Sequence, residues 1–502
     1  MEEKHTQSPQ QYDASYSHVL KYTGLFGGVQ VLTMLVGVLR TKVVAIFLGP
    51  AGLALINIYN NVVSLLNQCT NMGISFSAVK DVAEKYAQAD KEGIEASVRS
   101  VRAWCVVTAI VGTLAGLVLS PIISMLTFGN YSYTYSFALL SPMVGMLALT
   151  GGEMAILKGL KCLKRVAAIS VVCALVTLLV YLVFYGTMGA TSIVPALLLS
   201  NLGILLVHLY YSTKVVPWNL KILNTNTLKY GMPFIKLGVA YILAGAFGQG
   251  AEYVMRALMV RLGGVDVVGL YNCGYIMIVS YASLVFMAVE NDYFPRLSAV
   301  KDDRRLMCNT VNKQIEVCVL LVAPILVSFV MLMPWVVRLL FSAAFVSSVN
   351  MATCAVFYMF FKSLTLPVAY LPLAHGHSKI YVVSEVAYDV LLAIAVPAFY
   401  YLFGLEGTGW ALTLMGLFDL LFIHTFYYLK YGYRFKPASP IAFIAQFAML
   451  AVAVYASLRM DFAPKCMVGG IVITASAYLS FSILNKETHL LETLKNKFFK
   501  QK

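Results

Sequence analysis

The chain has 502 residues, of which 60% are hydrophobic and 12% charged, and its formal net charge is +14. Soluble globular proteins contain about 45–50% apolar and about 25% charged residues, so this composition excludes a soluble protein. A transmembrane β-barrel is excluded too, because barrel strands alternate apolar and polar residues, whereas runs such as 166–184 are continuously apolar here. The chain is therefore predicted to be an all-α integral membrane protein.

The spacing of the apolar runs predicts the membrane spans. A helix needs roughly 20 apolar residues to cross the hydrocarbon core. Runs between charged residues or Pro/Gly breaks predict about fourteen such helices joined by short loops. In chain order they lie near 19–39, 54–77, 101–126, 134–157, 166–186, 191–212, 233–258, 267–290, 315–339, 351–374, 380–403, 408–429, 440–458 and 466–484.

The distribution of basic residues predicts the orientation of these spans. Most of the 37 lysines and arginines fall in the even-numbered connections and the two terminal segments. Basic residues concentrate on the cytoplasmic side of membrane proteins, so both termini are predicted to be cytoplasmic. The net charge of +14 is then a signal of topology, and no nucleic-acid partner is predicted.

An internal repeat predicts two lobes. Ser77–Asp81 recurs identically as Ser298–Asp302, and Leu48-Gly49 is echoed by Leu262-Gly263, six predicted helices further on. Repeats on the same side of the membrane are related by an axis along its normal. The predicted organisation is an N-terminal tail (1–18), a six-helix lobe (19–214), a cytoplasmic linker (215–232), a second six-helix lobe (233–430), additional helices 13 and 14 (431–485) and a basic cytoplasmic tail (486–502).

Four basic residues are candidates for substrate binding. A charged side chain in mid-bilayer costs roughly 2.5 kcal/mol or more, so it is expected to face the bundle interior or a hydrated cavity. Arg40, Lys42, Arg256 and Lys362 belong to predicted helices 1, 7 and 10, which would line a central cavity between the lobes. Guanidinium and ammonium groups match phosphate, so these residues indicate an anionic cargo.

Acidic residues within the spans are candidates for ion coupling. Glu385 and Asp389 are four residues apart on one helical face, where two like charges are unfavourable unless a cation or proton lies between them. Asp419 and Glu153 are further candidates. A second interpretation is open, in which Lys362 pairs with Glu385 in a purely structural role and Asp389 is solvated.

Motifs for catalysis and cofactor binding are absent from the sequence. There is no GxxxxGK[ST] loop for nucleotide binding, and His375-Gly376-His377 is too short and isolated to be a metal site. No catalytic residue, metal or cofactor is predicted, and the chain is predicted not to be an enzyme. Two alternatives to an anion transporter are a cation-coupled small-molecule exporter and, less favoured, a membrane-embedded polysaccharide polymerase or ligase, which would need a long outward loop.

Several segments resemble one transporter family. They are Phe47–Leu53, Gly73-Ile74 followed by Val79-Lys80 and Ala83–Tyr86, Leu157–Leu160, Phe294–Ser298 and Phe361-Lys362 through Tyr381–Val386. In these segments the chain resembles Wzx-type flippases, polysaccharide transporters of the multidrug/oligosaccharidyl-lipid/polysaccharide (MOP) superfamily, and is most similar to lipid III (enterobacterial common antigen) flippases. Predicted helices 13 and 14 depart from the twelve-helix pattern of those flippases.

The resemblance implies a fold and a function. The fold would be a V-shaped bundle of two lobes in the bacterial inner membrane. The function would be to move an undecaprenyl-pyrophosphate-linked oligosaccharide, such as an O-antigen, common-antigen or capsule repeat unit, from the cytoplasmic to the periplasmic leaflet by alternating access. Partners implied are this lipid-linked oligosaccharide, membrane lipids, and polysaccharide polymerase and chain-length proteins.

Overall fold

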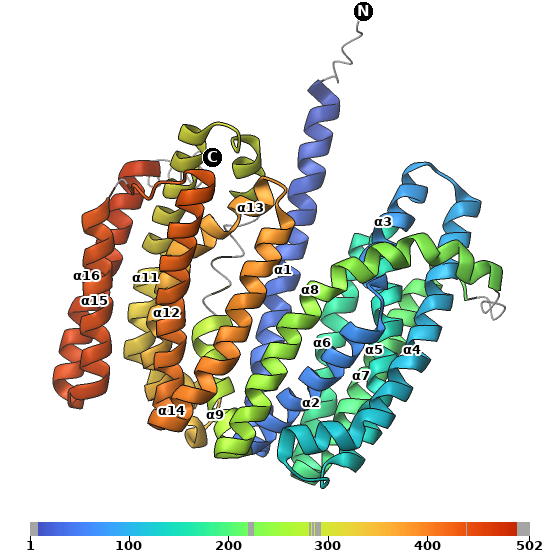
Figure 1. The fold of residues 1–502 in the computed structure, drawn as a ribbon, viewed down its shortest axis with the longest axis horizontal. Coiled ribbons are helices and arrows are strands. Elements are labelled where there is room, and N and C mark those ends of the chain that lie inside the picture. The colour runs from blue at the N-terminus through green and yellow to red at the C-terminus, as the bar shows by residue number, and fades with distance from the viewer. Residues whose placement is uncertain are drawn as a thin grey trace, which may run out of the picture. The chain divides into compact units, whose positions relative to one another are not determined.

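A computed structural model describes residues 9–218, 225–280, 283, 286, 293–437 and 439–488. This part of the chain is almost entirely helical and contains no strand (Figure 1). Nine of its helical stretches are long and apolar enough to cross a membrane, and two of them, 163–213 and 378–431, each hold two predicted spans. The prediction of an all-α membrane protein is confirmed.

The first half of the described chain consists of seven α-helices. They are α1 (Pro9–Phe47), α2 (Gly49–Thr70), α3 (Ile74–Ala87), α4 (Lys91–Phe128), α5 (Thr134–Gly159), α6 (Leu163–Met188) and, after the short η1 (Gly189–Ser192), α7 (Ile193–Thr213). The single span predicted at 54–77 is wrong in its C-terminal part, where the helix breaks. Gly73 adopts φ 68°, a left-handed conformation that glycine tolerates, and starts the separate helix α3.

Helices α4 and α5 pack closely because small residues face each other. A Cβ atom on Gly145 would lie 2.7 Å from Thr113 Oγ1 and 3.0 Å from the carbonyl oxygen of Ala109. Membrane helices lack a hydrophobic drive to associate with each other, so close backbone approach at small residues supplies van der Waals contact instead. Helix α5 also packs against α3 and α7, which places it at the centre of this half.

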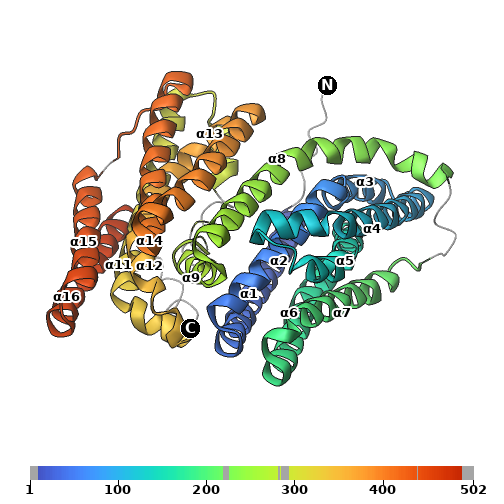
Figure 2. The same ribbon diagram turned by 60° about the horizontal axis from the view of Figure 1, so that its bottom comes forward.

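The second half begins with α8 (Thr225–Gly263), α9 (Val265–Tyr275) and the π-helical η2 (Ile276–Ser280). It continues through α11 (Arg304–Leu340), η3 (Ala343–Phe345), α12 (Ser348–Ala369), α13 (Leu371–Ala374), α14 (Ser378–Tyr431), α15 (Pro440–Arg459) and α16 (Phe462–Thr488), as Figure 2 shows. Helix α14 contains two predicted spans, 380–403 and 408–429. Gly404, at φ 66° and ψ −154°, is non-helical and separates them.

The chain packs as two compact units, Met1–Tyr253 and Val254–Lys502. Corresponding elements recur along the sequence: α1 and α8 both contain 39 residues, and α4 and α11 contain 38 and 37. Asp90 and Asp303 cap α4 and α11. Asp90 accepts one hydrogen bond from a backbone N–H group of the first turn, and Asp303 accepts two. The division between the units falls inside α8, C-terminal to the predicted linker 215–232, and the predicted lobe boundaries stay predictions.

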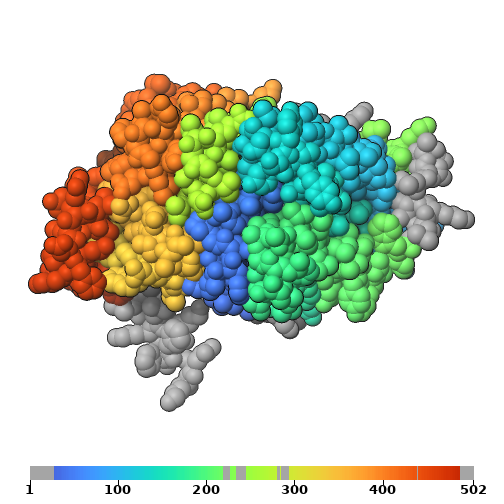
Figure 3. All heavy atoms as spheres, turned by 90° about the horizontal axis from the view of Figure 1, so that it is seen from below, coloured from blue at the N-terminus to red at the C-terminus, as the bar shows by residue number. Residues whose placement is uncertain are grey.

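The additional helices α15 and α16 belong to the second unit, where both pack against α11. Buried Gln446 on α15 donates hydrogen bonds to Ser480 Oγ at 2.8 Å and to the Ser476 carbonyl oxygen at 3.1 Å, and Ser476 Oγ donates to Gln446 Oε1 at 2.6 Å. Every polar atom of the Gln446 amide group therefore has a partner, as burial requires. The space-filling view shows the red α15–α16 pair packed onto neighbouring helices of this unit (Figure 3).

Four predicted segments lie partly outside the described residues, among them the linker 215–232, in which residues 219–224 are not described. The predicted N-terminal tail 1–18 is described only from residue 9, and the basic tail 486–502 only to residue 488. Much of the eighth predicted span, 267–290, also falls outside, so only its α9 and η2 portion is described.

Candidate functional site

The clearest cluster of charged side chains within the second unit is built around Lys362 on α12. Lys362 Nζ lies 3.7 Å from Asp419 Oδ2, on the second half of α14, and the side chains are 23% and 10% exposed. Helices α12 and α14 form one of the most extensive contacts in the molecule. The two residues are far apart in sequence, so the pair depends on this helix packing.

A pocket of about 240 Å³ surrounds the pair. Lys362, Asp419 and Glu385 all line it, and Glu385 comes from the first half of α14. The break at Gly404 separates the two halves of this 54-residue helix, which lets residues from both reach one pocket. Ser384, Tyr388 and Tyr427 add polar groups to the lining. The apolar walls include Leu391, Phe418 and Phe422.

The pocket holds more acidic than basic groups. Both Asp419 and Glu385 act electrostatically on Lys362, whose Nζ also lies 5.7 Å from the centroid of the Tyr388 ring, in cation–π range. One ammonium group cannot neutralise two carboxylates, so full ionisation would leave one excess negative charge in a largely apolar pocket. Binding of a proton or a small cation removes that excess charge, which is the chemistry that ion coupling requires.

The acidic pair predicted at 385 and 389 is only partly represented in this pocket. Asp389 is half-buried on α14, one turn beyond Glu385, and is not among the residues that line the pocket. The partner of Lys362 in the ion pair is Asp419. Sequence reasoning had placed Lys362 beside Glu385, and the structure puts all three side chains around one pocket.

The remaining predicted cations are distributed over both units. Arg40 is exposed and Lys42 half-buried on α1, in the first unit. Arg256 on α8 belongs to the second unit, and its Nε donates a long hydrogen bond of 3.5 Å to Asn272 Oδ1. A central cavity shared by Arg40, Lys42, Arg256 and Lys362 stays a prediction.

Glu153 on α5 is held in a buried ion pair. Arg102 Nε and Nη2 donate to its two carboxylate oxygens at 2.9 and 3.1 Å. Trp218 Nε1 donates to the same carboxylate at 3.0 Å, and Arg102 also donates to the carbonyl oxygens of Val216 and Pro217, both at 2.9 Å. The cluster ties the segment after α7 to the first unit, which favours a structural role for Glu153.

Sequence reasoning missed Arg102, Trp218 and Tyr388. Arg102 lies at the edge of the predicted span 101–126, so the sequence gives no reason to expect it in the interior. Tyr388 lies three residues after Glu385, which places both on one helical face. This spacing could have identified Tyr388 as a neighbour of Glu385. No local pattern marks Trp218.

The comparisons show what this fold is similar to. Two solved structures share the helical architecture, one of them a transporter of the MOP superfamily. An inward-facing multidrug resistance MATE family transporter of that superfamily matches with a TM-score of 0.65 and 13% identity over 80% of this chain and 94% of its own. The lipid II flippase MurJ, in an inward closed conformation, matches with a TM-score of 0.64 and 14% identity over 93% of this chain and 99% of its own.

The family is shown by sequence. Residues 43–350, more than half of the chain, match the family described as polysaccharide biosynthesis protein, and the chain belongs to this family. A MOP superfamily transporter from Pyrococcus furiosus is also similar in structure, with a TM-score of 0.54 and 13% identity over 82% of this chain and 96% of its own. No curated protein sequence matches the chain significantly.

The extent of the MurJ match bears on α15 and α16. The part of this chain that the MurJ match leaves out is shorter than these two helices together. At least part of the α15–α16 region therefore has a structural counterpart in MurJ.

Proposed function

We propose that this protein is a flippase that moves an undecaprenyl-pyrophosphate-linked oligosaccharide from the cytoplasmic to the periplasmic leaflet of the bacterial inner membrane. The observation that carries the proposal is the family match over residues 43–350, which concerns polysaccharide biosynthesis. The structural similarity to MurJ, a lipid II flippase, supports a lipid-linked substrate. The substrate repeat unit would be an O-antigen, common-antigen or capsule unit, handed on to polysaccharide polymerase and chain-length proteins.

The cations on α1 and α8 suit the charged part of such a substrate. A pyrophosphate carries oxygens that accept hydrogen bonds from guanidinium and ammonium groups. Arg40, Lys42 and Arg256 would bind this group in a cavity between the lobes, while the polyprenyl chain stays in the lipid. The lobes would alternate the access of that cavity between the two sides of the membrane.

The pocket around Lys362 suits the coupling step. With Asp419 and Glu385 ionised, the ammonium group of Lys362 is held at Asp419, 3.7 Å away. Protonation of Asp419, or a cation bound between the two carboxylates, would weaken that pair and release Lys362 as a fourth cation for the substrate. Asp389, one turn along α14, is a candidate for the same relay.

A second function is favoured by one observation. Two carboxylates against one cation in the Lys362 pocket also suit a cation-coupled exporter of small cationic molecules. The solved MATE transporter to which this chain is similar is described as a multidrug resistance protein. The family match weighs against this alternative, since it concerns polysaccharide biosynthesis.

The test is to delete the gene and identify what accumulates. We expect an undecaprenyl-pyrophosphate-linked oligosaccharide to accumulate on the cytoplasmic leaflet, and the wild-type gene to reverse the accumulation. The Asp461→Asn variant, which changes an exposed residue between α15 and α16, serves as a matched control and should complement fully. Normal surface glycan in the deletion strain, together with new sensitivity to cationic drugs, would establish the exporter instead.

A further inference from the structure

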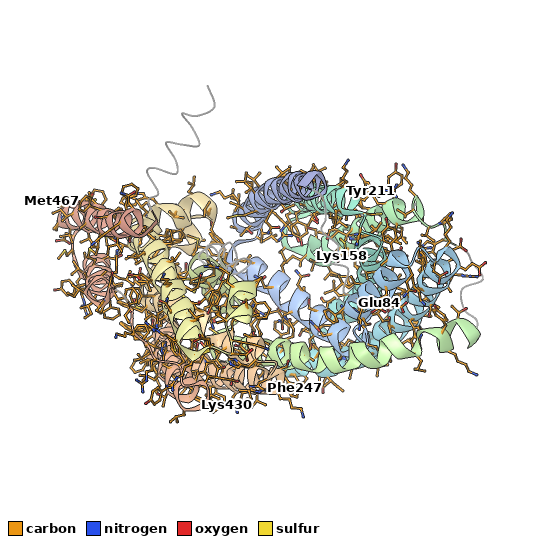
Figure 4. The ribbon with its side chains drawn as sticks, turned by 90° about the horizontal axis from the view of Figure 1, so that it is seen from above. Glu84, Lys158, Tyr211, Phe247, Lys430 and Met467 are labelled. Atoms are coloured by element: carbon orange, nitrogen blue, oxygen red, sulfur yellow. The ribbon has the colours of Figure 1, made fainter. Side chains whose placement is uncertain are left out.

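A second pocket lies at the end of the second unit where α11 begins and α14 ends. Its volume is about 480 Å³. Lys301, Arg304 and Lys430 line it, together with His375 and His377 from the turn between α13 and α14. Figure 4 labels Lys430 at this end of α14. The transport function proposed above uses none of these residues.

The pocket carries an excess of positive charge. Asp302 is the one carboxylate in the lining, against the permanently charged groups of Lys301, Arg304 and Lys430. Among the described residues, none of these three cations forms an ion pair with a carboxylate. Arg304 Nε instead donates to the carbonyl oxygen of Gly432 at 2.8 Å, a neutral partner that orients the guanidinium group and leaves its charge uncompensated.

The two copies of the internal repeat differ in charge near Lys301. Lys80 and Lys301 occupy the same position in the repeated Ser-Ala-Val-Lys-Asp segment. Lys80 Nζ lies 3.8 Å from the carboxylate of Glu84, four residues along the same helix. The residue four positions after Lys301 is Arg305, which cannot neutralise it. The repeat thus has an acidic partner in one copy and a further cation in the other.

The histidines form a fixed aromatic wall. His375 and His377 stack with ring centroids 6.1 Å apart and planes 19° apart, and the Tyr431 ring lies 4.7 Å from His375. His375 Nδ1 lies 2.9 Å from the Leu371 carbonyl oxygen, and His377 Nδ1 lies 3.0 Å from Tyr431 Oη. A carbonyl oxygen only accepts, so Nδ1 of His375 carries the proton. Both rings are held before any ligand arrives, which lowers the entropic cost of binding.

The start of α14 adds to the positive potential. His377 is the N-cap of this helix, and its side chain makes no capping hydrogen bond to the first turn. The N-terminus of a long helix favours anions, since its free N–H groups point outward. Together with Lys301, Arg304 and Lys430 in the pocket lining, this N-terminus suits a ligand that carries several oxygen acceptors.

We propose that this pocket binds the phosphate group of an anionic phospholipid. Arginine, lysine and a helix N-terminus together match phosphate oxygens. Leu306 lies two residues after Arg304 and Leu429 directly before Lys430, and they are 50% and 75% exposed, so exposed apolar side chains occur where α11 begins and α14 ends. Basic pockets beside exposed apolar surface are typical of sites for lipid head groups, because the acyl chains have a surface to follow.

The test measures lipid binding to the full-length protein in detergent by native mass spectrometry. Phosphatidylglycerol should bind the wild type about tenfold more tightly than phosphatidylcholine, whose choline cation opposes the lysines. The Lys301→Gln/Lys430→Gln variant should lose this preference. Lys80→Gln/Lys91→Gln removes the same charge from the first unit and should keep it. Equal binding of the two lipids by the wild type, or an unchanged preference in the Lys301/Lys430 variant, would overturn the proposal.

Two further measurements exclude misfolding and distinguish a lipid phosphate from soluble inorganic phosphate. Lys301→Arg/Lys430→Arg keeps the charge and should keep the preference, and its loss there would contradict a charge-based site. Arg304 stays unchanged throughout, since its bond to Gly432 is structural. Inorganic phosphate at millimolar concentration should not displace phosphatidylglycerol. Displacement would overturn the assignment to a lipid and leave a site for soluble phosphate. The readout is binding, so it is independent of transport.

Discussion

Arg102 donates two hydrogen bonds to Glu153, at 2.9 and 3.1 Å, with the two side chains only 3% and 2% exposed. This pair joins α4 to α5 and, through Trp218, Val216 and Pro217, fixes the segment that follows α7. The same segment begins the predicted connection between the two lobes. The pair is therefore placed to determine where that connection starts.

Breaking the pair on one side should destabilise the protein strongly. Glu153→Ala leaves the Arg102 charge buried without a carboxylate, which costs about 3–5 kcal/mol in the free energy of unfolding. Thermal unfolding of the purified protein measures this. Glu84→Ala is the matched control, because its pair with Lys80 is exposed and is worth about 0–1 kcal/mol. Equal effects of the two substitutions would contradict a structural role for the buried pair.

The pocket around Lys362 should determine coupling to a proton gradient. In vesicles, wild-type transport of lipid-linked oligosaccharide should be faster under an imposed pH gradient. Asp419→Asn and Glu385→Gln should each abolish this dependence, because each removes one of the two carboxylates that share Lys362. Wild-type transport at the same rate with and without the gradient would refute proton coupling.

A double variant separates coupling from stability at this site. Asp419→Asn leaves Lys362 without its partner, whereas Lys362→Gln/Asp419→Asn removes both charges. The double variant should recover the thermal stability lost in Asp419→Asn, since no uncompensated charge remains in the pair. It should still lack the response to the pH gradient. Recovery of that response would show that the pair acts only on stability.

Substitution of the predicted cavity cations should reduce export. Arg40→Gln, Lys42→Gln and Arg256→Gln each remove a charge proposed to bind pyrophosphate, and we expect about a tenfold loss of export for at least one of them. Surface glycan in a complemented deletion strain measures this, and membrane fractions report insertion. Arg99→Gln, on the exposed surface of α4, is the matched control. Wild-type export in all three variants would refute the assignment.

Cysteine labelling tests the predicted topology. In a background without the nine native cysteines, Ser132→Cys in the α4–α5 turn should react with an impermeant reagent from the periplasm. Lys91→Cys, at the start of α4, should react only after the membrane is opened, because the positive-inside rule places it in the cytoplasm. The reverse pattern would invert the orientation of the whole chain.

Gly404 should be required for the break within α14. Its φ of 66° and ψ of −154° are strained for any side chain, and a Cβ atom there would meet no neighbour within 4 Å. Gly404→Ala should therefore cost about 1–2 kcal/mol through the backbone alone. Gly470→Ala on α16 is the matched control, with equal space and ordinary helical φ, and should leave the thermal unfolding temperature nearly unchanged.

The sequence by itself predicts the class of fold, the order of the spans and the internal repeat. The bilayer sets the length of each apolar run, and that length is a local property that can be read without the structure. The two spans inside α14 are predicted in this way, on either side of Gly404. The break at Gly73 falls inside the single predicted span 54–77, where polar and apolar residues are mixed and the length of an apolar run sets no boundary.

Only the tertiary structure decides which charges meet. Sequence reasoning identified Lys362, Glu385 and Asp419 as unusual, because charges in apolar runs are costly, yet it could not pair Lys362 with Asp419 on another helix. Sequence reasoning likewise could not pair Arg102 with Glu153. It also could not place the turn at His375 in the lining of the proposed phosphate pocket. Such contacts depend on how helices distant in sequence pack and rotate, which no local pattern of residues specifies.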